Sequence, residues 1–141
     1  MAKESLYRTF VARMEASLAA QMYLEASWYA YAVLEDRLVS LLRNSGGLAG
    51  AVRMMGPKLK ELSRRAKYDA LLAANFEENR LDAWREARNE LMHAMADATM
   101  SIAEIDAGAR DLAIEGAALV REYAAACRRL KKHRNKVDAH P

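Results

Sequence analysis

An arginine, an amide and an imidazole lie close together in residues 81–93, and side chains of these types can handle a phosphodiester. Arg88 and Asn89 are adjacent, and His93 follows four residues after Asn89. A guanidinium holds phosphate oxygens through its forked donors, and an imidazole takes or gives a proton near neutral pH. Asn89 could orient either the phosphate or the imidazole. No other segment of the sequence has comparable chemical content.

The direction of each side chain follows from the helix that this segment predicts, with a rotation of about 100° per residue. The stripe expected to face the core consists of Leu81, Trp84, Ala87, Leu91 and Met95. His93 then lies nearly opposite this stripe, whereas Arg88 lies at its edge, about 140° from His93. Asn89 and His93 are i,i+4 neighbours and can touch. One helix therefore does not aim Arg88 and His93 at one point, but a two-fold pair of subunits would bring such groups together.

A second interpretation makes His93 an ordinary surface residue, because several acidic residues share its face of the helix. These residues are Asp82, Glu86, Glu90 and Asp97. Both interpretations place His93 outside the core, and the geometry alone does not separate them.

The spacing of Arg before His is a weak signal, because all three histidines of the chain have it. Arg128 precedes His133, and Arg134 precedes His140, at similar distances along the sequence. The pair of Arg134 and His140 falls in the terminal basic tail, where order is less expected. The pair of Arg128 and His133 lacks the Asn and lies at the end of the last helix. The pair within residues 88–93 is preferred because it lies inside a strongly patterned helix.

Composition favours one all-α domain spanning residues 1–141. The chain has 141 residues, 52% of them hydrophobic, with only two prolines. The single cysteine, Cys127, excludes an intrachain disulfide, and we expect it to be a packing residue in a cytoplasmic protein. No apolar run is long enough to span a membrane, so we expect no membrane association. The short connections favour an antiparallel bundle of four to five helices, with about residues 134–141 as a flexible basic tail.

Helix boundaries follow from apolar periodicity and from breakers. The pattern predicts helices over about residues 4–43, with a bend near Ser17-Leu18, and over 58–75, 79–98 and 102–133, plus a short segment near 48–55. The stops are Asn44-Ser45-Gly46-Gly47 and Gly56-Pro57. Ser101 and Glu104 form a capping box at the start of the last helix. Its apolar pattern includes Ile102, and that of the first stretch includes Trp28.

Charge is nearly balanced overall, at +3, but basic residues gather in residues 53–67 and 121–141. Two such stretches are compatible with nucleic-acid contact, and equally with solvated helix faces. Arg128 and Lys131 are the candidates for substrate contact in the second stretch. Arg85, one turn before Asn89, could add a phosphate contact.

Charge also interrupts the apolar pattern at Glu35-Asp36-Arg37. These residues either form an exposed face or bring Glu35 or Asp36 close enough to tune the histidine.

The run Trp84-Arg85-Glu86-Ala87-Arg88-Asn89-Glu90-Leu91-Met92-His93 resembles the motif of HEPN domains (higher eukaryotes and prokaryotes nucleotide-binding). These are compact helical bundles marked by Arg, a polar residue such as Asn, and His after a short gap. The aromatic segment 23–37 and the basic final helix extend the resemblance over most of the chain, although only the motif helix is specific.

The resemblance implies a metal-independent endoribonuclease that acts as a homodimer, with its site across the dimer cleft and no metal or cofactor. Arg88 and His93 would be catalytic, with Asn89 supporting them. Many such proteins are toxins of toxin–antitoxin or phage-defence systems, often neutralised by a nucleotidyltransferase-like antitoxin.

The chemistry expected of these groups is attack of a ribose 2′-OH on the adjacent phosphorus, with the proton taken by the imidazole. Arg88 would stabilise the charge that grows on the phosphate oxygens. Some HEPN relatives are non-catalytic, so the alternative is a helical dimer that binds RNA, a nucleotide or a protein partner. The third hypothesis is a helical bundle that serves only for protein interaction, in which the match to the motif is a coincidence.

Overall fold

The computed structural model describes residues 3–48 and 53–139, and it is all-helical over this part of the chain. The helices are α1 (Lys3–Ala19), α2 (Tyr23–Arg43), α3 (Met55–Ala66), α4 (Ala70–Ala73), α5 (Glu78–Asp97) and α6 (Ile102–Ala139). The predicted helical class is confirmed. The described residues form six helices rather than the four to five expected, because two of the predicted helices are each divided.

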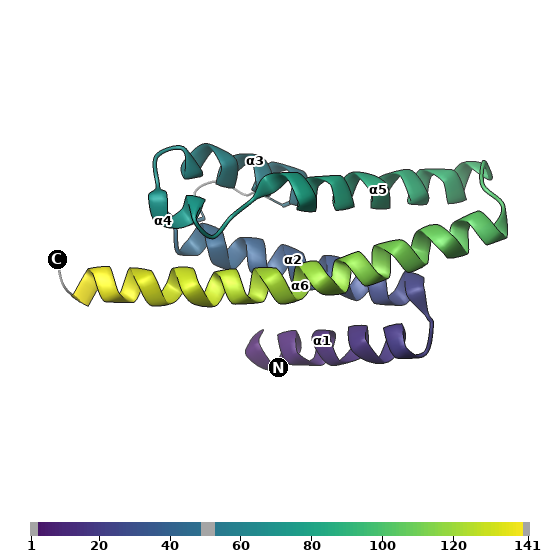
Figure 1. The fold of residues 1–141 in the computed structure, drawn as a ribbon, viewed down its shortest axis with the longest axis horizontal. Coiled ribbons are helices and arrows are strands. Elements are labelled where there is room, and N and C mark those ends of the chain that lie inside the picture. Colours follow the sequence, from purple (N-terminus) through teal and green to yellow (C-terminus); the bar gives the residue numbers. More distant parts are fainter. Residues whose placement is uncertain (1–2, 49–52, 140–141) are drawn as a thin grey trace.

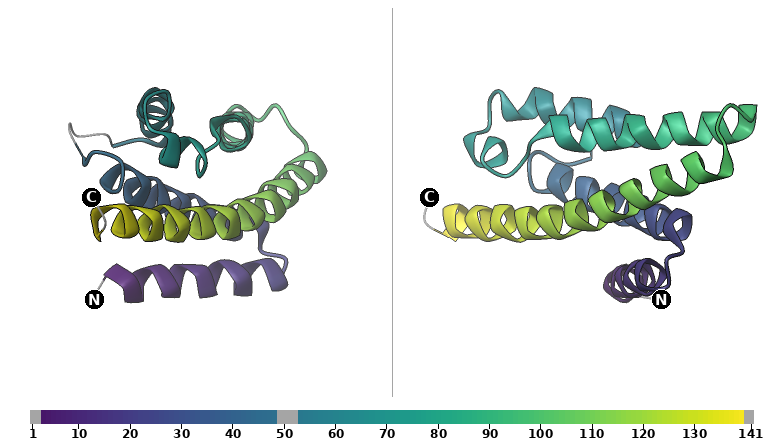
Figure 2. Two further views of the ribbon diagram at one scale, coloured as in Figure 1. Left: turned by 60° about the vertical axis from the view of Figure 1, so that its left-hand side comes forward. Right: turned by 45° about the vertical axis from the view of Figure 1, so that its right-hand side comes forward.

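The helices form three layers (Figures 1 and 2). The central layer is the pair α2 and α6, and α6 runs the length of the molecule. On one side of this pair lies α1, and on the other lie α3, α4 and α5. None of the described helices is long and apolar enough to cross a membrane.

The first predicted helix is divided between α1 and α2, where the sequence indicated only a bend near Ser17-Leu18. Gln21 adopts a positive φ of 60°, and the amide of Met22 donates to the carbonyl of Ser17 at 2.8 Å. The chain reverses direction here without glycine or proline. As a result, α1 folds back along α2 (Figure 1).

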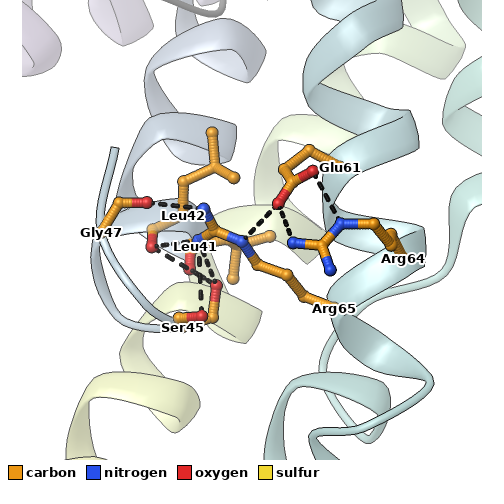
Figure 3. Close-up of polar contacts among 7 residues, drawn as sticks. All are labelled: Leu41, Leu42, Ser45, Gly47, Glu61, Arg64 and Arg65. Carbon is orange, nitrogen blue, oxygen red and sulfur yellow. Dashed lines mark hydrogen bonds and ion pairs between the residues drawn. The ribbon is translucent and has the colours of Figure 1, made fainter. Parts of the chain in front are cut away.

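The predicted stop after α2 is confirmed, and an arginine from α3 secures it. Gly46 and Gly47 have positive φ values of 126° and 92°, which favour glycine. Arg65 donates to the carbonyl oxygens of Leu42 at 2.9 Å and Gly47 at 2.8 Å, and it pairs with Glu61 at 2.9 Å (Figure 3). A side chain of α3 thus satisfies carbonyls at the C-terminal end of α2.

The segment predicted near residues 48–55 falls partly on residues 49–52, outside the described residues. The predicted stop at Gly56-Pro57 is wrong, because the next helix begins at Met55 and runs through both residues; Pro57 lies in its first turn, as expected. The prediction of one helix over 58–75 is wrong, because α3 ends at Ala66 and α4 begins at Ala70. Asp69 causes the restart by accepting a hydrogen bond from the amide of Leu72 at 3.1 Å.

The start of α6 is confirmed, but its predicted end is wrong. Ser101 and Glu104 exchange two hydrogen bonds of 3.1 Å, which is the predicted capping box. The helix does not fade near His133 but continues to Ala139. Arg134 holds this end by donating to the carbonyl of Asn44 at 2.9 Å and by pairing with Asp69.

The core forms where α2, α5 and α6 meet, and Trp84 is its central side chain. Trp84 is buried, and its indole N–H donates to the carbonyl of Leu112 at 2.9 Å. Gly116 permits this approach, because a Cβ there would lie 3.0 Å from both Ala30 Cβ and Trp84 Cζ2. The glycine therefore fixes how closely α6 meets its neighbours.

Three large residues of the predicted apolar stripes lie at the surface instead of in the core, and so does the small residue Ala87. Trp28 is 51% exposed, Met95 36% and Ile102 75%. Met95 and Ile102 belong to the joined ends of α5 and α6, which extend past the start of α2 (Figure 1). Helical periodicity identifies an apolar stripe but not how far along it a partner helix reaches.

Candidate functional site

The motif residues are all carried by α5, and the structure places them on different sides of that helix. His93 is exposed, whereas Arg88 and Asn89 are half-buried. This agrees with the directions expected from the helical rotation. The two sides of α5 differ in charge and in packing.

On the inner side of α5, Arg88 lies flat against an aromatic ring of α2. The guanidinium carbon of Arg88 is 4.0 Å from the centre of the Tyr31 ring. Tyr31 also stacks on Trp84, with ring centres 6.4 Å apart and an angle of 27° between the planes. A cation over an aromatic face is attracted by the ring quadrupole. Trp84 and Tyr31 together hold the arginine in place.

Tyr31 is in turn connected to a partly buried ion pair. Its hydroxyl donates to Glu35 Oε1 at 3.2 Å, and Lys58 Nζ of α3 lies 3.5 Å from Glu35 Oε2. The Lys58 side chain is only 5% exposed. Burial, followed by the charge of Glu35 and its hydrogen bond, raises the pKa of Tyr31, so the phenol stays protonated at neutral pH. We call Arg88, Tyr31, Trp84, Glu35 and Lys58 the Arg88 cluster.

The guanidinium of Arg88 makes no hydrogen bond within the described chain, and its Nε is buried without an acceptor. The other half-buried arginines of the described residues each pair with a carboxylate. They are Arg37, Arg65, Arg85 and Arg134. Buried polar groups are normally hydrogen-bonded, and a half-buried cation without an anion is unusual. Nε is closed to solvent, so an anion from outside the chain would be bound by the terminal Nη atoms of Arg88, which make no hydrogen bond within the described chain.

On the outer side of α5, His93 lines an open hollow of about 460 Å³. The other lining residues are Glu86, Asn89, Glu90, Ala94, Asp97 and Thr99. Asn89 is thus beside His93, as its spacing predicts. The three carboxylates give the hollow a negative character that opposes a polyanion.

Within one subunit, the structure brings Asn89 and His93 together but does not bring Arg88 to them. Arg88 points toward α2, and His93 lines a hollow on the other side of the helix. A phosphate held by Arg88 would not reach the His93 of the same chain without additional groups.

The two acids considered for tuning the site have different surroundings. Glu35 belongs to the Arg88 cluster and so lies next to the motif arginine through Tyr31. Asp36 pairs with Arg37, whose guanidinium covers the ring of Tyr7 in α1 at 4.3 Å. Glu35 therefore faces α3 and α5, whereas Asp36 takes part in the contact with α1.

The predicted substrate-contact residues do not gather at the motif in one subunit. Arg85 pairs with Asp82 at 2.8 Å and lies 3.8 Å from Glu86, so its charge is already balanced. Arg128 and Lys131 are exposed on the C-terminal half of α6. The carbonyl of Leu112 marks the part of α6 that contacts Trp84. Arg128 and Lys131 lie at least 16 residues further along α6, which is about 24 Å from that contact.

Sequence reasoning missed Tyr31 and Lys58. Tyr31 has a local signal, because it stands four residues before Glu35 in the aromatic segment and can reach it along one helix face. Lys58 has none beyond its place in a basic stretch, because its contact with Glu35 spans 23 residues. The pair of Arg134 and His140 considered above extends outside the described residues.

Across the residues that the structure describes, no group of three or more His, Cys, Asp or Glu side chains is arranged to hold a metal ion. Comparison with protein-family models, with curated proteins and with solved structures gives no match for this chain.

Proposed function

We propose that the protein is a metal-independent endoribonuclease that acts as a homodimer, in which Arg88 of one subunit and His93 of the other form one site. The observation that carries this proposal is the half-buried guanidinium of Arg88, which has no acceptor and is held against Tyr31. An exposed imidazole lies less than two turns further along the same helix. Together they supply a hydrogen-bond donor for the phosphate and a group that transfers protons.

The reaction follows from these two groups. The imidazole of His93 takes the proton of a ribose 2′-OH, and the 2′-oxygen attacks the adjacent phosphorus. Arg88 donates to the non-bridging oxygens as their charge grows. The bond from phosphorus to the 5′-oxygen breaks, and that oxygen takes a proton from solvent, which recovers a proton when the imidazolium of His93 is deprotonated; each site thus uses one His93. The products are a 2′,3′-cyclic phosphate and a 5′-OH.

A dimer is part of the proposal because the two groups diverge on one helix by about 140°. A two-fold axis beside α5 would place each Arg88 near the partner's His93. Asn89 lies between the two directions and could orient the imidazole or the phosphate.

The physiological role proposed here is that of a toxin in a toxin–antitoxin or phage-defence system in the cytoplasm. This role rests on the resemblance of the motif to HEPN domains. It includes a nucleotidyltransferase-like antitoxin as the neutralising partner.

The acidic surroundings of His93 favour a second candidate, a non-catalytic helical dimer that binds RNA, a nucleotide or a protein partner. Glu86, Glu90 and Asp97 line the same hollow as His93 and repel a phosphate chain. In this reading, Arg88 and Tyr31 hold an anionic group without cleaving it.

The experiment that separates these candidates is incubation of the full chain with mixed RNA in EDTA, followed by mapping of the ends. The endoribonuclease proposal predicts fragments with cyclic phosphate ends from the wild type and none from His93→Ala. His133→Ala is the matched control, because His133 is also exposed but lies near the end of α6. Equal cleavage by His93→Ala and the wild type, or no cleavage by either, contradicts the proposal.

A further inference from the structure

We propose that Trp28 is a base-stacking platform beside Arg88, so that the site takes a single-stranded RNA segment with an unstacked base. This inference rests on the endoribonuclease proposal and adds the class of substrate. Trp28 is an indole 51% exposed on α2, and large aromatic side chains are usually more buried than this.

The position of Trp28 connects it to the Arg88 cluster. Trp28 precedes Tyr31 by three residues on α2, so their Cβ atoms are about 5–6 Å apart on neighbouring parts of one helix face. Glu35 continues the same line, one turn after Tyr31. Arg88 covers the Tyr31 ring, and Trp28 is the aromatic side chain one turn before that ring on α2, with half of its surface open to solvent.

An exposed indole next to an unpaired guanidinium matches the two halves of a nucleotide. The ring offers a face on which any base can stack, and the guanidinium offers donors for the phosphate. Stacking of this kind needs a base that is not already stacked in a duplex. The substrate class is therefore single-stranded RNA, including loops and bulges, with little preference for base identity.

The unpaired positive charge of Arg88 favours a nucleic acid as the ligand. It favours an acidic protein surface less, because the carboxylates of such a surface have basic partners of their own. Glu35 is the carboxylate nearest to this face in the Arg88 cluster, and Lys58 already pairs with it at 3.5 Å. The positive charge of Arg88 is left without an anion in the described chain. The competing occupant, a second copy of the chain that covers Trp28, is an outcome of the test below.

The test measures binding of a short fluorescent single-stranded oligoribonucleotide by anisotropy, in a His93→Ala background that prevents cleavage. Trp28→Ala should weaken binding about 5- to 160-fold, which is the range for loss of one base–aromatic stack. Trp28→Phe should restore most of the affinity. Tyr68→Ala is the matched control, because Tyr68 is 86% exposed but lies between α3 and α4, and it should change nothing.

A second probe, a ribose-phosphate backbone of the same length without bases, isolates the stacking contribution. It should bind the background protein and its Trp28→Ala form equally, and Arg88→Ala should weaken it. If Arg88→Ala weakens RNA binding but Trp28→Ala does not, the platform is refuted and the proposed function stands.

Two further outcomes also decide the question. Loss of affinity for both probes together with dissociation of a dimer, measured by light scattering, would show that Trp28 is a subunit contact and would overturn the platform. Failure of the background protein to bind either probe would overturn both the platform and the RNA-directed function beneath it.

Discussion

Arg65→Ala should destabilise the fold more than any neighbouring charge substitution, because Arg65 connects α3 to the end of α2. Its side chain is 10% exposed and donates to the backbone carbonyls of Leu42 and Gly47, with a longer contact of 3.4 Å to that of Ser45. Figure 3 shows the guanidinium lying between these carbonyls and Glu61. Its removal leaves the carbonyl of Gly47 without this donor in a turn of two glycines with positive φ.

The expected cost follows from the bonds that are lost. A hydrogen bond to a charged group contributes about 1.5–3 kcal/mol. The carbonyl of Leu42 retains the amide of Gly47 at 2.9 Å, so its loss is partly compensated. The total is therefore about 2–4 kcal/mol, which corresponds to a fall in Tm of about 6–16 °C for a chain of this size. Arg65→Lys should recover about half, because an ammonium lacks the planar fork.

The assay is urea unfolding followed by far-UV circular dichroism, with Arg64→Ala as the matched control. Arg64 bonds to the same acid, Glu61, at 3.0 Å, but its side chain is 63% exposed. An exposed ion pair adds little to stability, so this control should remain close to the wild type. Equal destabilisation by Arg64→Ala and Arg65→Ala would refute the reasoning, because it would assign the effect to Glu61 rather than to the carbonyls.

Three further predictions concern packing, pH and thiol reactivity. Gly116→Ala should be about 1–3 kcal/mol less stable than Gly108→Ala in urea unfolding. The new Cβ at position 116 lies 3.0 Å from Ala30 and Trp84, which cannot move easily, whereas at position 108 it lies 3.3 Å from a movable methyl of Leu91. Equal stabilities of the two variants would contradict this. Hydrogen bonds from Arg64 and Arg65 lower the pKa of Glu61 from 4.5 to about 2. The stability that Glu61 contributes is therefore present above pH 4.5 and is lost as the pH falls toward 2. Glu61→Gln should flatten that part of the stability profile in acid titration, and an unchanged profile would count against the pairing. Burial raises the pKa of the Cys127 thiol, so a disulfide reagent should label it only at the rate of unfolding; rapid labelling of the folded chain would contradict its place in the core.

Local patterns in the sequence are sufficient to predict the motif helix and the capping box of Ser101 and Glu104. The directions of Arg88 and His93 also follow from the sequence, because they depend only on the helical rotation. These features need no knowledge of distant residues. For this reason the sequence predicts the residues of the candidate site better than their surroundings.

Features that depend on distant contacts could not be predicted in the same way. The turn at Gln21 has no glycine or proline, although the chain reverses there. The end of α6 is ordered by contacts of Arg134 with Asn44 and Asp69, which are far away in sequence. Likewise, the placement of Arg88 on Tyr31 depends on how α2 and α5 pack, which periodicity does not determine.

The most direct test of the central claim is a complementation assay between two inactive variants of the full chain. Arg88→Ala and His93→Ala are each purified, unfolded together and refolded as a mixture, and RNA cleavage in EDTA is measured. A site shared between subunits leaves one of the two sites intact in each mixed dimer, so the mixture should recover about a quarter of the wild-type activity. A mixture that stays inactive, beside a wild type that cleaves RNA after the same treatment, would contradict a site built from Arg88 of one subunit and His93 of the other.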